Sequence, residues 1–200
     1  MSPKTAVEKK EMENVPYREA LGCLMYAYQG TRPDLGSAIT TLGSFAENPG
    51  KAHWNALKCT LRYLKGTKDL RLKIDCSKPM ELIGYCNANW AGDTDSRRST
   101  SGYVFLLGSC AVSWCSRRQQ SVSLSTTESE YIAMSLATQE LLWLKRLMED
   151  IDKSCIREPI CLYSDNQSAI KLASSDNYYA RSKHIDTRYK FIKKRSPVKC

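Results

Sequence analysis

Residues 84–90 read Gly-Tyr-Cys-Asn-Ala-Asn-Trp and complete a short segment, Leu82–Trp90, that has the texture of a β-strand. On its N-terminal side, Leu70-Arg-Leu-Lys-Ile74 alternates between apolar and charged residues, as a strand does. On its C-terminal side the sequence predicts further short strands at Gly102–Leu107, Ala111–Trp114 and Ser121–Leu124. We therefore expect a sheet built around Leu82–Trp90.

A long helix is predicted after these strands. Its apolar residues recur at three- and four-residue steps and so line one helix face: Tyr131, Met134, Ala137, Leu141, Leu144, Met148 and Ile151. Thr127-x-x-Glu130 is typical of a capping box at its start. A strand at Ile160–Ser164, a short helix from Asn166 to about Ala173 and a basic amphipathic helix over 186–194 follow. This order predicts an α/β fold in which a mixed sheet has flanking helices.

The N-terminal part of the chain has a different pattern. Residues 15–67 are periodic in the manner of helices, with Pro33 suited to the first turn of the second helix and Asn48-Pro-Gly50 separating it from a third. Residues 1–14 are polar and charged, and we predict that they are disordered. The predicted regions are therefore 1–14, a helical region over 15–67, and the sheet-containing domain over 68–195.

Composition excludes several classes of protein. The 200 residues contain no apolar run of the roughly 18 residues that a membrane span needs, and their polar start is not a signal peptide. We therefore expect an intracellular protein with no membrane partner. The nine cysteines are scattered without a Cys-x-x-Cys pair, and only two histidines accompany them. This pattern predicts buried free thiols in preference to a zinc site or disulfides.

The formal net charge of +9 indicates a possible polyanionic partner, because a basic protein attracts nucleic acid whatever its fold. Positive charge is densest near the C-terminus, where the candidate nucleic-acid-binding residues are Arg181, Lys183, Arg188, Lys190, Lys193 and Lys194. Solvated positions on a surface helix are the alternative interpretation of the same residues.

Several longer strings carry a family resemblance. They are Tyr85-Cys-Asn-Ala-Asn-Trp-Ala-Gly-Asp93, Arg97-Arg-Ser-Thr-Ser-Gly-Tyr-Val104, Ser125-Thr-Thr-Glu-Ser-Glu-Tyr-Ile-Ala133, Asp165-Asn-Gln-Ser-Ala-Ile170 and Lys183-His-Ile-Asp186. In this order they closely resemble the ribonuclease H domain of copia-type retrotransposon Pol polyproteins. Upstream, Tyr17–Tyr26, Thr31–Asp34 and Leu61–Thr67 are similar to the segment that joins reverse transcriptase to that domain. The resemblance covers roughly residues 15–195.

The resemblance implies a ribonuclease H-like sheet and a chemistry, the hydrolysis of the RNA strand of an RNA–DNA hybrid during reverse transcription. The implied cofactor is Mg²⁺, with Mn²⁺ as a substitute, because hard cations need oxygen ligands held close together. The implied partners are the hybrid and an upstream reverse transcriptase, in the cytoplasm or a virus-like particle. Glu130 and Asp165 fall on the second and third metal-binding acids of the family.

The chain also departs from the family pattern. Asn87 stands where the family carries its first aspartate, within Asn87-Ala-Asn-Trp90. The segment with the fourth acid is missing before Cys200, so the domain is expected to be truncated at its C-terminus, and Asp186 is a weak substitute. We therefore expect impaired catalysis, with a non-catalytic nucleic-acid-binding module or an inert polyprotein fragment as alternatives.

Each candidate also has a purely structural interpretation. Glu130 could be the partner of Thr127 in a capping box, and Asp165 could cap the helix that starts near Asn166. Asn87 could be no more than a polar strand residue.

Overall fold

The computed structural model describes residues 2–75, 77, 80–93, 95–152, 160–174 and 191–192. The chain divides into two compact units, Met1–Leu72 and Lys73–Cys200. Most of the predicted basic helix over 186–194 lies outside the described residues. None of the helices in the described ranges is long and apolar enough to cross a membrane.

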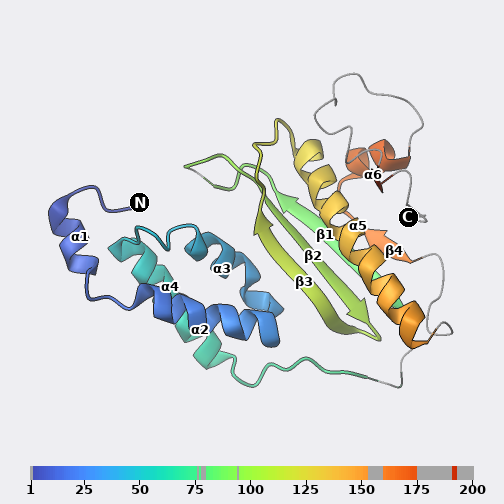
Figure 1. The fold of residues 1–200 in the computed structure, drawn as a ribbon, viewed down its shortest axis with the longest axis horizontal. Coiled ribbons are helices and arrows are strands. Elements are labelled where there is room, and N and C mark those ends of the chain that lie inside the picture. The colour runs from blue at the N-terminus through green and yellow to red at the C-terminus, as the bar shows by residue number, and fades with distance from the viewer. Residues whose placement is uncertain are drawn as a thin grey trace. The chain divides into compact units, whose positions relative to one another are not determined.

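The first unit is helical. Its elements are α1 (Ala6–Met12), α2 (Tyr17–Gly30), the short 3-10 helix η1 (Pro33–Leu35), α3 (Gly36–Gly43) and α4 (Lys51–Gly66) (Figure 1). Apolar residues at helical spacing form its core, in which Leu24 of α2, Ile39 of α3 and Leu57 of α4 are buried. The helices predicted in this region are therefore present, and Pro33 starts the 3-10 turn that leads into α3.

Helix α1 corrects one expectation, because it lies within residues 1–14, which we predicted to be disordered. Its start is stabilised by a reciprocal cap: the Thr5 hydroxyl accepts from Glu8 N at 3.3 Å, and the Glu8 carboxylate accepts from Thr5 N at 3.1 Å. The two bonds satisfy backbone donors that a free helix end leaves open. Helix α1 buries none of its residues, and besides this cap the structure shows an exposed ion pair between Glu11 and Lys51 of α4 at 4.0 Å.

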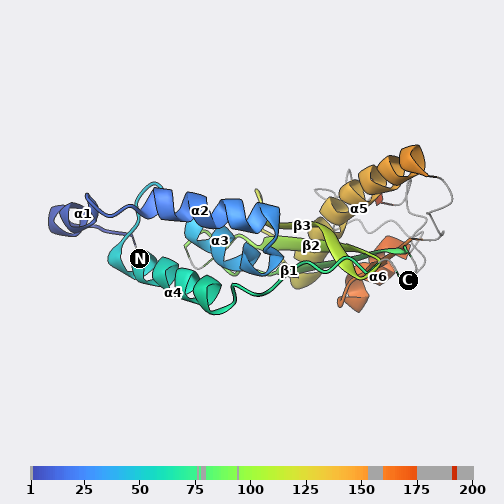
Figure 2. The ribbon, with the colours of Figure 1, turned by 90° about the horizontal axis from the view of Figure 1, so that it is seen from below.

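The second unit contains a four-stranded mixed sheet in the order β3-β2-β1-β4. Neighbours β1, β2 and β3 pair antiparallel, whereas β4 lies parallel to β1. The strands are β1 (Leu82–Asn89), β2 (Thr100–Leu107), β3 (Cys110–Arg118) and β4 (Cys161–Tyr163). Helix α5 (Thr126–Ile151) runs along one face of the sheet, and the short α6 (Gln167–Ser174) follows β4 (Figures 1 and 2). The predicted mixed sheet with flanking helices is confirmed.

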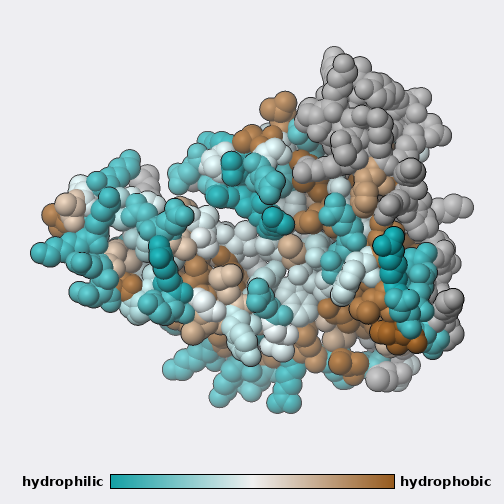
Figure 3. Space-filling view, in the orientation of Figure 1, coloured by the Kyte–Doolittle hydropathy of each residue, from teal (hydrophilic) through white to brown (hydrophobic). Residues whose placement is uncertain are grey.

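The core of this unit lies between the sheet and α5. Tyr131 and Leu141 of α5 pack in one buried cluster with Phe105 of β2 and Leu162 of β4. Gly84 at the middle of β1 leaves the space that the Phe105 ring and the Leu162 side chain occupy. Beyond the core, Trp143, Leu147 and Ile151 are exposed on the C-terminal half of α5, and Figure 3 shows apolar surface gathered over that part of the helix.

Two predicted strands and one assumption about cysteines are wrong. Leu70–Ile74 and Ser121–Leu124 have no strand structure, and the side chains of Leu70 and Ile74 are 55% and 72% exposed. Alternation alone does not make a strand when no neighbouring strand supplies hydrogen bonds. Cys86 and Cys110 are buried free thiols as expected, but Cys23 and Cys59 are exposed.

Candidate functional site

Asn87 and Asp165 line one open hollow of about 500 Å³ on the sheet. The strand register explains why they meet. Tyr85 of β1 is paired with Tyr163 of the parallel strand β4. Asn87 and Asp165 each follow two residues later in the same direction, so they come to the same end of the sheet. The two tyrosine rings stack with centroids 5.3 Å apart and form part of the same hollow.

Glu130 approaches this end of the sheet from α5. Its Oε1 accepts a hydrogen bond at 2.9 Å from the backbone N–H of Ala88, the residue that follows Asn87 in β1. The side chain is only 6% exposed, and its Oε2 is buried with no hydrogen-bond partner among the described residues. Burying a carboxylate oxygen that accepts no hydrogen bond lowers the stability of the fold, and a bound cation can offset this loss.

The electrostatics of the site follow from this burial. Burial raises the pKa of the Glu130 carboxyl above its usual value, the hydrogen bond from Ala88 N opposes this, and the negative charge of Asp165 raises the pKa further. The coupling shows that the two acids lie within electrostatic reach of each other. Asn87, which shares the hollow with Asp165, is a neutral amide.

The structure excludes the proposed capping role of Glu130. The N-cap of α5 is Ser125, whose hydroxyl accepts from Glu128 N at 3.1 Å, and Glu128 in turn accepts from Leu124 N at 2.7 Å. The predicted capping box of Thr127 and Glu130 is therefore wrong, because the helix begins earlier. Glu130 does not cap the helix, and its carboxylate accepts a hydrogen bond from Ala88 N of β1.

Asp165 is not a helix cap either. The amide oxygen of Asn166 accepts from Ala169 N at 2.9 Å and so caps the first turn of α6. Asp165, one residue earlier, lies on the wall of the hollow. The structural roles proposed for both acids are thus filled by neighbouring residues.

Asp93 is committed elsewhere. Its carboxylate accepts from the Ser96 hydroxyl at 2.6 Å and pairs with Arg118 at 2.7 Å. These contacts, together with the N–H of Asp95, lower its pKa to about 2 although partial burial opposes the shift. Asp93 therefore organises the loop after β1, through Ser96, Asp95 and Arg118.

Other residues of the quoted strings have structural roles in this loop. The Trp90 indole donates to Ser123 O at 3.0 Å, and the Ser99 hydroxyl accepts from Ala91 N at 3.1 Å. Sequence reasoning missed Gln119, whose side-chain amide donates to the Ser101 hydroxyl and to the carbonyl of Ser129, next to Glu130. Neither hydrophobic periodicity nor a sequence motif indicates that a buried glutamine links β2 to α5 in this way.

The remaining candidates lie outside the described residues. These are Asp186 and the basic residues Arg181, Lys183, Arg188, Lys190, Lys193 and Lys194. Among the residues that the structure does describe, no group of three or more His, Cys, Asp or Glu side chains could hold a metal ion. The local set consists of two carboxylates, from Glu130 and Asp165, and the amide of Asn87.

Comparison with known proteins identifies relatives over nearly the whole chain. The chain is 46% identical over 193 residues to the retrovirus-related Pol polyprotein from transposon TNT 1-94 of Nicotiana tabacum, covering 96% of this chain and 14% of that protein. It is 37% identical over 194 residues to the corresponding polyprotein from transposon RE2 of Arabidopsis thaliana, again 96% of this chain and 13% of the relative. It thus spans about a seventh of the length of these polyproteins.

A shorter relative is also similar. The secreted RxLR effector protein 161 of Plasmopara viticola is 51% identical over 133 residues, which cover 66% of this chain and 94% of that protein. No protein-family model matches the chain, and no solved structure matches it. Over 96% of its length the chain is therefore similar to retrovirus-related Pol polyproteins of copia-type retrotransposons.

Proposed function

We propose that the second unit is a ribonuclease H-type domain of a retrotransposon Pol polyprotein, with an impaired catalytic site. The reaction of such a domain is the metal-dependent hydrolysis of the RNA strand of an RNA–DNA hybrid. The observation that carries the proposal is the placement of three residues around the end of β1: Asn87 and Asp165 line one hollow, and Glu130 bonds to Ala88 N and lies within electrostatic reach of Asp165. These are the positions at which the resembling family holds its first three metal-binding acids.

The topology supports this proposal. Three antiparallel strands are followed by a long helix and then by a strand parallel to the first, which places β4 beside β1. This connection is what brings a residue after β4 level with Asn87 of β1. The same chain order of strand, helix and strand ligands is expected of a ribonuclease H-like sheet.

The residues present fit a divalent cation such as Mg²⁺ or Mn²⁺, although incompletely. Glu130 offers a buried oxygen that has no donor among the described residues, and Asp165 supplies a second negative charge within electrostatic reach. Both are hard oxygen ligands of the kind that Mg²⁺ prefers. When bound, such an ion supplies an activated hydroxide and stabilises the leaving oxygen.

The chain's own residues explain why activity should be weak. Asn87 can offer an amide oxygen but no charge. If the missing acid contributes about 4 kcal/mol to the stability of the transition state, its loss slows the reaction roughly a thousandfold. Asp186 is the proposed weak replacement for a fourth acid.

A second function, nucleic-acid binding without cleavage, is favoured by the net charge of +9 together with the neutral residue at position 87. In either case we propose that the protein acts on an RNA–DNA hybrid, beside a reverse transcriptase and in the cytoplasm or a virus-like particle. The name of the effector relative describes secretion of that protein. We attribute its similarity to a shared Pol-derived sequence, because the transposon matches cover almost all of this chain.

The test combines cleavage, metal binding and hybrid binding on the 200-residue chain. With labelled hybrid and Mg²⁺ or Mn²⁺ we expect no appreciable cleavage, but salt-dependent hybrid binding and a Mn²⁺-dependent rise in Tm that Glu130→Gln abolishes. Robust cleavage by the unmodified chain would refute the impairment. Absence of both metal-dependent stabilisation and hybrid binding would identify an inert fragment and refute the proposal as a whole.

A further inference from the structure

A second, smaller hollow lies apart from the residues that line the Asn87 hollow. It measures about 180 Å³ and lies between the end of β3, the loop that follows it and one side of α5. Arg117, Arg118 and Gln119 form one wall, while Ser135 and Gln139 of α5 form another. Its lining includes no aspartate or glutamate, so the hollow is polar and positively charged.

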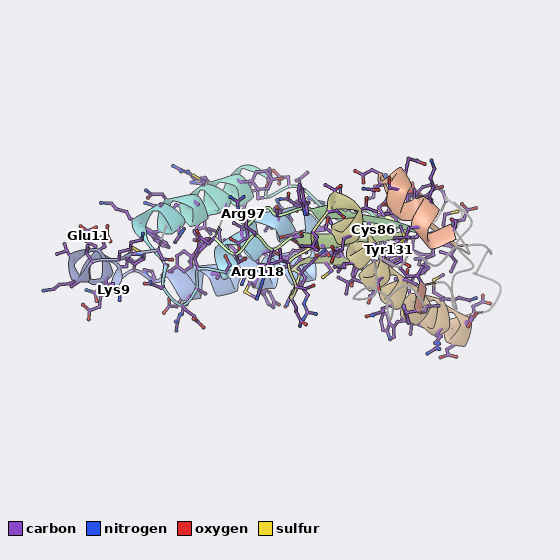
Figure 4. All side chains as sticks on the ribbon, turned by 90° about the horizontal axis from the view of Figure 1, so that it is seen from above. Lys9, Glu11, Cys86, Arg97, Arg118 and Tyr131 are labelled. Carbon is purple, nitrogen blue, oxygen red and sulfur yellow. The ribbon has the colours of Figure 1, made fainter. Side chains whose placement is uncertain are left out.

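An ion pair and several hydrogen bonds fix one wall of this hollow in the ligand-free protein. The Arg118 guanidinium is paired with Asp93 at 2.7 Å, and Asp93 is itself fixed by Ser96. The Gln119 amide donates to the Ser101 hydroxyl at 2.8 Å and to Ser129 O at 3.0 Å. Figure 4 labels Arg118 and Arg97 at one end of the sheet, away from Cys86 and Tyr131, which belong to the buried core. A preorganised wall reduces the ordering that binding requires.

Other donors of the hollow are not engaged. Arg117 is exposed and forms no salt bridge within the described ranges. Ser135 is 2% exposed, and its hydroxyl forms no hydrogen bond with another described residue. The Arg117 guanidinium, the Ser135 hydroxyl and the Gln139 amide line this one hollow. Such donors suit an anionic oxygen cluster, because Arg binds phosphate through a rigid fork of donors.

We propose that this hollow binds a phosphate group of a nucleic-acid strand. The position of the hollow favours a phosphate within a nucleic-acid strand over a free phosphate ion as the ligand. Ser101, which holds Gln119, is the cross-strand neighbour of Ala88, and Gln119 also bonds to Ser129, the residue before Glu130. The phosphate hollow and the carboxylate site therefore share one hydrogen-bonded wall, and a single strand can pass both. This inference rests on the nucleic-acid binding of the proposed function and does not require hydrolysis.

The experiment compares two charge-removing variants of the same chain. Arg117→Gln removes the free cation of the hollow, and Arg146→Gln removes an exposed cation further along α5 as a matched control. Binding of a short RNA–DNA hybrid is measured by fluorescence anisotropy over a range of salt concentrations. Arg117→Gln should weaken binding about 3- to 10-fold and reduce the slope of log K against log salt by about 1, whereas the control should change neither.

A second measurement separates the two sources of phosphate. Amide resonances of Ser135 and Gln139 are followed during titration with the hybrid and, separately, with inorganic phosphate, and Ser135→Ala should reduce the response to the hybrid. Equal effects of Arg117→Gln and Arg146→Gln would refute the proposal, because they indicate diffuse attraction. A response to inorganic phosphate but not to the hybrid would refute it too, since the hollow would then be a site for a free anion. Neither result depends on whether the chain cleaves RNA.

Discussion

Glu130 of α5 accepts a hydrogen bond at 2.9 Å from the backbone N–H of Ala88 in β1. The bond ties the helix to the strand that carries Asn87, and it leaves the second carboxylate oxygen buried without a partner among the described residues. A carboxylate in this position destabilises the metal-free protein when it is charged. It is therefore better explained by a ligand that the site is built to hold than by packing.

Glu130→Gln should stabilise the metal-free protein at neutral pH. The wild-type pKa is raised, so the folded state holds a proton that the unfolded chain releases. The stability of the wild type relative to the variant is then largest below the ordinary pKa near 4.5 and is lost as the pH rises through the raised value. We expect a gain on the order of 1 kcal/mol at pH 7, the scale of the penalty for a buried polar group without a hydrogen-bond partner. Urea unfolding in EDTA from pH 4 to 8 measures it, and a pH-independent difference would contradict the assignment.

Asn87→Asp should trade stability for metal affinity. A third negative charge near Glu130 and Asp165 adds repulsion without metal, so Tm should fall, and Mn²⁺ should raise it by more than in the wild type. Asn89→Asp, two residues further along β1 and outside the lining of the hollow, is the matched control. Equal metal responses of the two variants would count against position 87 as a ligand site.

Asp93→Asn should destabilise the loop after β1. The pKa of Asp93 is lowered to about 2, so its charge contributes stability above the ordinary value of 3.8, and this contribution is lost as the pH falls towards 2. We expect a loss of about 1 kcal/mol at pH 7 that shrinks below pH 3, as for a charged hydrogen bond. Asp95→Asn removes an exposed charge nearby and should have little effect. Thermal unfolding of both variants at pH 7 and at pH 2.5 measures this difference. A loss of stability in Asp93→Asn that is the same at both pH values would contradict the role given to the Asp93 charge.

Gly84→Ala should destabilise the second unit by about 1–3 kcal/mol, the usual range for an overpacked core. A Cβ at this position would lie 2.8 Å from Leu162 Cδ1 and would overlap the Phe105 ring. The control is Gly22→Ala in α2, where no atom lies within 4 Å of the added Cβ. Alanine should stabilise that helix by roughly 0.5–1 kcal/mol. A neutral Gly84→Ala variant would mean that Phe105 can move aside.

Much of the architecture could be read from local sequence. Strands β1, β2, β3 and β4 and helices α5 and α6 all overlap their predicted segments, because the periodicity of buried side chains is a local property. Helix starts were less predictable. Both Ser125 and Thr127 can cap a helix, and the choice of Ser125 places Glu128, not Glu130, in the role of capping partner.

The sequence by itself determined the residue types of the site, the period of each element and the family to which the quoted strings point. Only the tertiary structure decided that Leu70–Ile74 stays outside the sheet, that Asn166 caps α6, that Asn87 and Asp165 share one hollow, and that Glu130 bonds to Ala88 N. Each of these outcomes depends on a partner distant in the chain, such as the Ala88 N–H for Glu130 or the parallel register of β4 against β1. A hydrogen bond between segments 42 residues apart leaves no periodicity in the sequence, because its energy arises only when folding brings the two groups together.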